Sequence, residues 1–211
     1  GAMQILRRHA SVLFRWQDRS LTTGQRYHFL AGWLPWMADG FNLLFNAAAL
    51  TWSLAMVAFP RHVQPPLVIF AVLPLSLFVF KLVKLLHLYR TRVGANFRQT
   101  IAAALAGLGL AHTIGAAMLS GLVKSDRPFF RTPKLAGHGG VLQALAEARE
   151  ELYILILLWG AMAGLLVVHE MDTTDAYAWL AMLLLQSLAY LAAVVMSFLA
   201  VVPPRENAQP L

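Results

Sequence analysis

The sequence predicts an all-α membrane protein with four transmembrane helices in two hairpins, together with amphipathic interface helices. Hydrophobic residues make up 59% of the 211-residue chain and charged residues only 13%, against about a quarter charged in soluble proteins. Several apolar runs approach or exceed the ~20 residues that cross a bilayer as a helix. The positions of the Lys and Arg residues between these runs then predict how many of them span the membrane.

Residues 1–32 are predicted to form a cytoplasmic amphipathic interface segment. They are too polar to span a bilayer, but their first half shows helical spacing. The face of this helix is expected to consist of Ile5, His9, Val12, Leu13 and Trp16. We expect the helix to end near Asp18 and its arginines to lie on other faces. The alternative is a disordered basic tail.

Five apolar segments are candidates for membrane spans. They are Trp33 to Phe59, Pro66 to Tyr89, Thr100 to Val123, Leu152 to Val168 and Tyr177 to Val202. We expect a first transmembrane hairpin at 33–89 and a second at 152–202. Between them, 90–151 is predicted to be cytoplasmic, with an interface helix and a loop, and 203–211 forms a polar tail.

The third segment decides the topology. If it does not span and the amino terminus is cytoplasmic, Arg61 alone of the 17 Lys and Arg residues lies outside and 16 lie inside. If all five segments span, the division falls to 10 inside and 7 outside, so the positive-inside rule favours four spans. We expect an interfacial or re-entrant helix that packs closely through Gly107, Ala111 and Gly115. The alternative is an ordinary fifth span.

The first span carries a polar stripe. Asp39, Asn42, Asn46 and Ser53 are separated by 3, 4 and 7 residues, and Trp36 lies one turn before Asp39. This spacing places them on one face of a helix. Carboxylate, amide and indole groups together suit a sugar chain, which needs hydrogen bonds and a flat stacking surface. The alternative is an interhelical hydrogen-bond cluster, with Trp33, Trp36 and Trp52 as interface anchors.

A cationic loop with paired aromatic residues follows the third segment. Its most informative residues are Phe129, Phe130, Arg131, Thr132 and Lys134. A diphosphate calls for a bidentate guanidinium, a point charge and a hydroxyl donor, which Arg131, Lys134 and Thr132 supply. The alternative is a positive-inside loop with two Phe side chains dipping into lipid.

This loop resembles the F-x-V-T-x-K gating loop of processive family 2 glycosyltransferases such as bacterial cellulose synthase. Phe129, Thr132 and Lys134 match the motif, and Arg131 stands in place of its Val. The order of interface helices, spans and loop extends the resemblance over most of the chain. It implies a region that gates UDP-sugar binding and forms the glucan channel of a synthase that polymerises hexose into a β-glucan and exports it. Trp36, Asp39, Asn42 and Asn46 would then line that channel.

The catalytic signatures of this family are not found in the chain. No D-x-D or T-E-D triplet occurs, and Gln25 to Phe29 only imitates the acceptor-binding Q-x-x-R-W motif. Gly1-Ala2-Met3-Gln4 resembles the residues that follow that motif, although Gly-Ala-Met also occurs as a cloning remnant. We expect a fragment of a hexosyltransferase that is inactive alone, has no catalytic residue and binds no cofactor. The Mg or Mn ion expected of the parent enzyme would belong to its missing catalytic domain.

The expected partners are the lipid bilayer, the missing catalytic domain, the UDP-sugar and the glucan chain. The net charge of +7 does not indicate nucleic-acid binding, because no contiguous basic face is present. The His residues are not at metal-ligand spacing, so no metal site is expected. The resemblance implies the bacterial inner membrane, with both termini cytoplasmic. A rival interpretation is a small stand-alone transporter or scaffold without catalytic activity.

Overall fold

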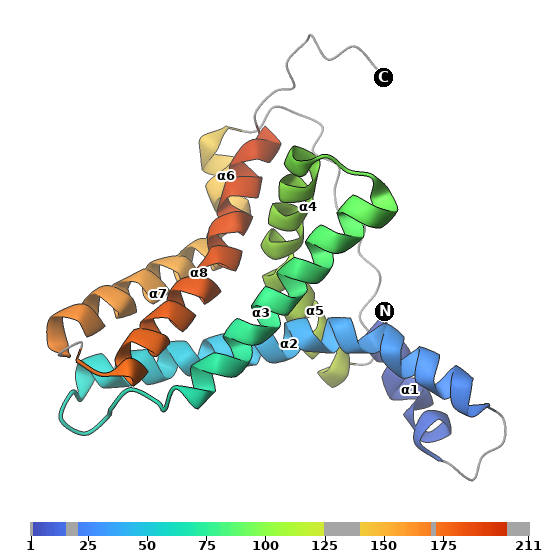
Figure 1. The fold of residues 1–211 in the computed structure, drawn as a ribbon, viewed down its shortest axis with the longest axis horizontal. Coiled ribbons are helices and arrows are strands. Elements are labelled where there is room, and N and C mark those ends of the chain that lie inside the picture. The colour runs from blue at the N-terminus through green and yellow to red at the C-terminus, as the bar shows by residue number, and fades with distance from the viewer. Residues whose placement is uncertain (1, 16–20, 125–139, 170–171, 202–211) are drawn as a thin grey trace. The chain divides into compact units, whose positions relative to one another are not determined.

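The computed structural model describes residues 2–15, 21–124, 140–169 and 172–201, and these ranges contain helices and no strand (Figure 1). In chain order the helices are α1 (Ala2–Phe14), α2 (Thr23–Ala58), α3 (Ile69–Leu88), the π-helix η1 (Tyr89–Val93), α4 (Phe97–Gly109), α5 (Ala111–Val123), α6 (Val141–Glu147), α7 (Arg149–Val168) and α8 (Thr174–Val201). The predicted all-α membrane fold is confirmed.

Five stretches within the described ranges are long and apolar enough to cross a membrane. They are Met37–Ala58, Ile69–Val93, Phe97–Val123, Arg149–Val168 and Thr174–Val201. The third combines α4 and α5, two helices of 13 residues that meet at Leu110. Either helix alone is shorter than the ~20 residues that a span needs. The chain is a multi-pass membrane protein, and the prediction of four rather than five spans still rests on the charge division.

The start of α4 is determined by local sequence. Gly94 ends η1 with φ at 67°, a left-handed conformation that Gly adopts without steric cost. Asn96 and Gln99 then form a capping box, in which each side chain accepts a hydrogen bond of 2.9 Å from the other residue's backbone N–H. These bonds satisfy two N–H groups that a helix start leaves without an intrahelical partner. The helix therefore begins at Phe97, three residues before the predicted start of the segment.

The chain divides into two compact units. Unit 1 comprises Gly1–Phe45 and Ala111–Lys134, and unit 2 comprises Asn46–Leu110 and Leu135–Leu211. In unit 1, α1 packs against α5 over a core of Met3, Leu13, Trp33 and Met118. A helix is therefore present at the amino terminus, and its place in the membrane interface stays a prediction. Leu13, which we assigned to the same face as Ile5 and His9, lies instead in this core, while those two residues are exposed.

Two arginines hold α1 in place within unit 1. Arg7 donates hydrogen bonds to the carbonyl oxygens of Leu122 and Val123 at 3.2 and 2.9 Å. Arg26 is 5% exposed and donates to the carbonyl oxygens of Val12 and Leu13, both at 2.6 Å. The last carbonyls of a helix have no intrahelical partner. Arg7 thus satisfies carbonyl groups at the end of α5, and Arg26 satisfies carbonyl groups at the end of α1.

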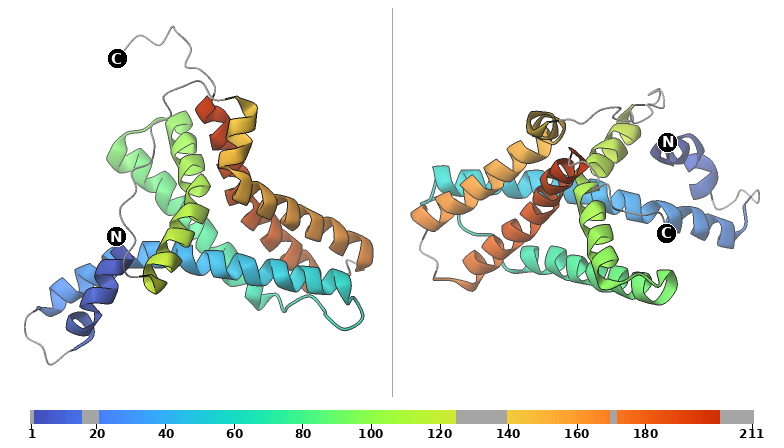
Figure 2. Two further views of the ribbon diagram at one scale, coloured as in Figure 1. Left: turned by 180° about the vertical axis from the view of Figure 1, so that it is seen from behind. Right: turned by 90° about the horizontal axis from the view of Figure 1, so that it is seen from above.

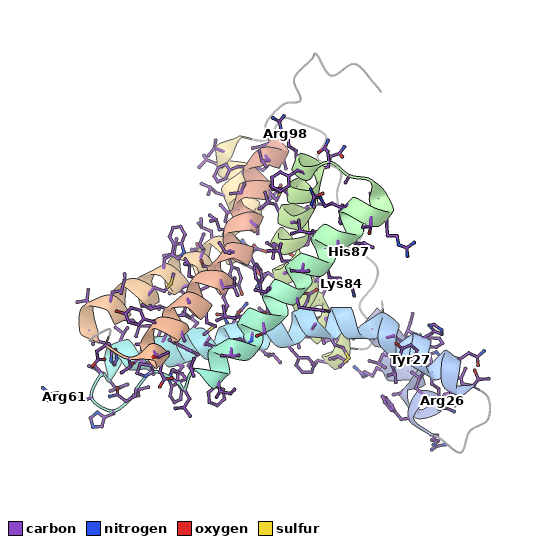
Figure 3. The ribbon with its side chains drawn as sticks, in the orientation of Figure 1. Arg26, Tyr27, Arg61, Lys84, His87 and Arg98 are labelled. Carbon is purple, nitrogen blue, oxygen red and sulfur yellow. The ribbon has the colours of Figure 1, made fainter. Side chains whose placement is uncertain are left out.

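Unit 2 is built around α8. The hairpin of α7 and α8 is visible from behind and from above, and α4 and α6 also pack against α8 (Figure 2). The second half of α2 contacts the hairpin as well, since a Cβ atom on Gly164 of α7 would lie 2.9 Å from the Val57 side chain. Arg61 lies at one end of this unit and Arg98 at the other (Figure 3). Phe70, Val79, Phe80 and Val83 of α3 are exposed, as lipid-facing side chains of a span would be.

Close helix approach in the third segment uses glycines. A Cβ atom on Gly115 would lie 2.7 Å from the Asp39 carbonyl oxygen, so α5 meets α2 there without a side chain between them. Gly115 was predicted to act in this way, and Ala111 is buried as well. Gly107 was also predicted, but this prediction is wrong because a Cβ atom on Gly107 would have no neighbour within 4 Å. Gly109 takes that role, with Ala193 Cα of α8 at 3.2 Å.

Candidate functional site

The loop residues singled out in the sequence, Phe129, Phe130, Arg131, Thr132 and Lys134, lie outside the described residues. Their role in binding a diphosphate stays a prediction. The chain on either side of them is described, with α5 ending at Val123 and α6 beginning at Val141.

The predicted polar stripe of α2 is divided between the two units. Asp39 and Asn42 belong to unit 1, where Asp39 is half-buried and Asn42 is exposed, and the side chain of Trp36 lies outside the described part. Asn46 and Ser53 belong to unit 2, and both are buried. The burial therefore distinguishes the second half of the stripe from the first.

Asn46 and Ser53 make hydrogen bonds to α8. The Nδ2 group of Asn46 donates to the Tyr190 hydroxyl oxygen at 3.1 Å, and the Nε1 group of Trp179 donates to Ser53 Oγ at 3.0 Å. Ser53 in turn donates to the Ala49 carbonyl oxygen at 2.8 Å. Asn46 and Ser53 therefore take part in interhelical hydrogen bonds, as in the alternative that the sequence left open, and the channel role of the stripe stays a prediction. Such bonds hold helices together inside a bilayer.

The same region holds polar atoms without hydrogen-bond partners among the described residues. Asn46 is 4% exposed and its Oδ1 atom is unpaired, and Gln186 is 7% exposed with both side-chain polar atoms unpaired. A buried amide without a partner costs free energy, and a native protein normally satisfies it with protein, water or ligand. We call Asn46, Ser53, Trp179, Gln186 and Tyr190 the buried polar stripe.

Three members of the buried polar stripe were not predicted. Trp179, Gln186 and Tyr190 are separated by 7 and 4 residues on α8, which places them on one helix face. That spacing was readable in the sequence. Their hydrogen bonds to α2 were not, because no spacing along one span states which other span it will meet.

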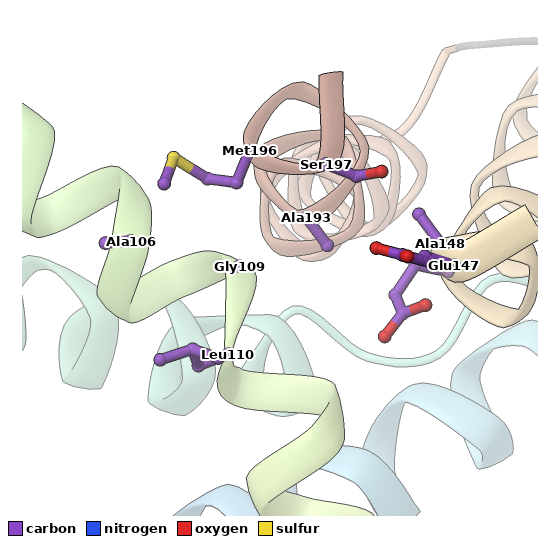
Figure 4. Close-up of a pocket in the computed structure, with 9 residues that line it drawn as sticks. Ala106, Gly109, Leu110, Glu147, Ala148, Ala193, Met196 and Ser197 are labelled. Carbon is purple, nitrogen blue, oxygen red and sulfur yellow. The ribbon is translucent and has the colours of Figure 1, made fainter. Parts of the chain in front are cut away.

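A separate pocket of about 310 Å³ lies at one end of unit 2 (Figure 4). Its lining comes from the end of α4, the junction of α6 and α7, and the last turns of α8. The residues are Ala106, Gly109, Leu110, Glu147, Ala148, Glu151, Ala193, Met196 and Ser197. Glu151 is only 8% exposed, and Ser197 Oγ donates a hydrogen bond to the Ala144 carbonyl oxygen. The pocket is apolar apart from its two carboxylates and one hydroxyl.

Fold and site together define a multi-pass, all-α membrane protein with a buried polar stripe between two of its helices. Within the described ranges, no group of three or more His, Asp or Glu side chains is placed to hold a metal ion. No known protein-family model, curated protein or solved structure matches the chain. Any more specific function therefore has to be argued from the residues themselves.

Proposed function

We propose that this chain is the channel and gating region of a processive family 2 glycosyltransferase that polymerises hexose from a UDP-sugar into a β-glucan and exports it. The single observation that carries the proposal is the match of Phe129, Thr132 and Lys134 to the F-x-x-T-x-K spacing of the family's gating loop. The helices around it fit this assignment. α4 and α5 precede the loop, and the α7–α8 hairpin follows it.

In the proposed gate, the loop closes over a diphosphate. Arg131 offers a planar fork of donors, Lys134 a compact cation and Thr132 a hydroxyl, which together match the several anionic oxygens of UDP. Phe129 and Phe130 would dock the closed loop by burying apolar surface. The transfer chemistry itself needs a base and a metal-binding carboxylate pair, which would come from a catalytic domain outside these residues.

The buried polar stripe supports a polysaccharide path through unit 2. A glucan offers many hydroxyl groups, and the unpaired amide atoms of Asn46 and Gln186 provide both a donor and acceptors for them. Of the residues predicted to line the channel, Asn46 belongs to the buried polar stripe. We add Gln186 to the proposed channel lining.

The proposed membrane is the bacterial inner membrane, with both termini cytoplasmic. The charge division supports this orientation, because Arg61 alone of the 17 basic residues would face outward in a four-span chain. The acidic stretch from His169 to Ala176, which covers the α7–α8 connection and the start of α8 and includes Asp172 and Asp175, contains no Lys or Arg and would also face outward.

The test uses the intact parent synthase that contains this region. Replacing both Arg131 and Lys134 by Ala removes charge-assisted hydrogen bonds worth about 1.5–3 kcal/mol each. We expect UDP-sugar turnover per inserted enzyme to fall at least ~10-fold, at ~1.4 kcal/mol per decade. Phe129→Ala should also lower turnover, through weaker docking of the loop.

The matched control is a double Ala variant at Arg90 and Arg92, two exposed cations at the end of η1. It removes the same number of charges from the same predicted side of the membrane, and its turnover should stay near that of the wild type. Normal turnover in the Arg131 and Lys134 variant would show that the loop is a lipid anchor and not a gate. Equal losses in both double variants would assign the effect to membrane charge.

A further inference from the structure

We propose that the pocket at the α4, α7 and α8 ends of unit 2 binds the headgroup of an aminophospholipid, with the Glu151 carboxylate accepting hydrogen bonds from its ammonium group. This site does not include the loop, and it adjoins the buried polar stripe, because Glu151 interacts electrostatically with Tyr190. The proposal does not depend on the glycosyltransferase assignment.

The position of the pocket fits a lipid headgroup. It touches the first turn of α7, which begins at Arg149, and the last turns of α8, which ends at Val201. Because α7 and α8 are consecutive spans joined by a short connection, these two ends lie on the same side of the membrane. The ends of spans lie at the level of the lipid headgroups. The pocket is therefore at the depth where a headgroup is found.

Glu151 carries the chemical part of the argument. It is 8% exposed and lines the pocket, and among the described residues none donates a hydrogen bond to its carboxylate. A carboxylate that is mostly buried needs a compensating charge or hydrogen bonds. Acidic residues are favoured in the first turn of a helix, but Glu150 satisfies that preference while exposed. The preference for acidic residues at a helix start therefore accounts for Glu150. It does not explain why Glu151 is buried and lines the pocket.

The rest of the lining selects the kind of cation. Apart from Glu151, Glu147 and Ser197, the pocket is formed by Ala, Gly, Leu and Met, which do not suit a strongly hydrated metal ion requiring six or more oxygen ligands. Glu147 already accepts a hydrogen bond from Gln143 Nε2 at 3.2 Å. A cation attached to an apolar body fits better. The volume of about 310 Å³ is at the lower limit of ligand pockets and admits a headgroup while the acyl chains stay in the bilayer.

This chemistry predicts which headgroup binds. A primary ammonium has three N–H donors, whereas the quaternary ammonium of phosphatidylcholine has the same charge and no N–H. The headgroup of phosphatidylglycerol has neither a positive charge nor an N–H donor. We therefore expect the purified full-length chain, exchanged into bilayer discs of each lipid with identical acyl chains, to retain phosphatidylethanolamine preferentially when examined by native mass spectrometry.

Glu151→Gln keeps the shape of the side chain and removes its charge, and should lower phosphatidylethanolamine retention about 10-fold. Glu150→Gln, one residue away and exposed, is the matched control and should leave retention unchanged. Ala106→Leu fills the pocket without altering charge, and should also lower retention. If Glu151→Gln loses its helical content, the Ala106→Leu variant provides the test of the lipid site. Equal retention of the ethanolamine and choline lipids by the wild type overturns the proposal, as does undiminished retention in the folded Glu151→Gln or Ala106→Leu variant.

Discussion

Asn46 of α2 and Tyr190 of α8, 144 positions apart in the chain, are joined by a hydrogen bond of 3.1 Å between the amide nitrogen and the phenol oxygen. Both residues are buried, and Tyr190 is 2% exposed. This bond and the one between Trp179 and Ser53 fix the rotation of α8 about its own axis relative to the second half of α2. Two hydrogen bonds about three turns apart on α8 exclude a rotated or shifted packing of these helices.

Tyr190→Phe should destabilise the protein by about 1 kcal/mol, because it leaves the Asn46 Nδ2 group buried without its acceptor and interhelical bonds in membranes contribute about that much. Tyr153→Phe is the matched control, since Tyr153 is an exposed residue of α7. Unfolding midpoints in the same bilayer mimic provide the measurement. Equal midpoints for the two variants would mean that the Asn46 bond does not contribute to stability.

Gly109→Leu should destabilise unit 2, whereas Gly107→Leu should not. A Cβ atom on Gly109 would already lie 3.2 Å from Ala193 Cα, so a larger side chain forces α4 away from α8 at a cost of about 1–3 kcal/mol. Nothing lies within 4 Å of the corresponding position at Gly107, and Leu is the better helix former by up to ~1 kcal/mol. Thermal unfolding of the two variants measures the difference. A greater loss at Gly107 would contradict the packing of α4 described above.

Arg26→Ala should release α1. The variant leaves the carbonyls of Val12 and Leu13 without the guanidinium that now donates to both, and hydrogen bonds to charged groups contribute about 1.5–3 kcal/mol. We expect amide hydrogen exchange in α1 to rise at least ~10-fold, since local opening governs exchange. Arg15→Ala removes an exposed arginine and serves as the control. Unchanged exchange in the Arg26 variant would show that the Met3 and Leu13 core holds α1 by itself.

The four-span topology can be tested with single Cys residues, because the chain contains none. In spheroplasts, a membrane-impermeant thiol reagent should label Cys at Thr174 and should not label Cys at Ser11 or Ser125. A five-span chain reverses the results at Thr174 and Ser125, because the added crossing by 97–123 exchanges the sides of everything after it. Labelling after membrane permeabilisation confirms that each unlabelled Cys is reactive.

Local sequence determined the helices of this protein. Membrane-length apolar runs predict spans by composition alone, because a segment in lipid must satisfy its backbone hydrogen bonds internally. The Gly94, Asn96 and Gln99 signals that begin α4 are also local, since a capping box involves residues only three positions apart. The helix at the amino terminus also followed from local spacing, but its packed face did not, because Leu13 packs with Met3 against α5 while Ile5 and His9 are exposed.

Helix pairing, in contrast, was decided by the tertiary structure. Gly107 and Gly109 have the same chemistry, and only the position of α8 beside α4 makes Gly109 the contact residue. Apolar spacing does not distinguish a face that meets lipid from one that meets another helix, because both remove the side chain from water. The α8 partners of Asn46 and Ser53 likewise could not be predicted from the sequence of α2. Glu151 and its pocket depend on three helix ends that meet only in the folded chain.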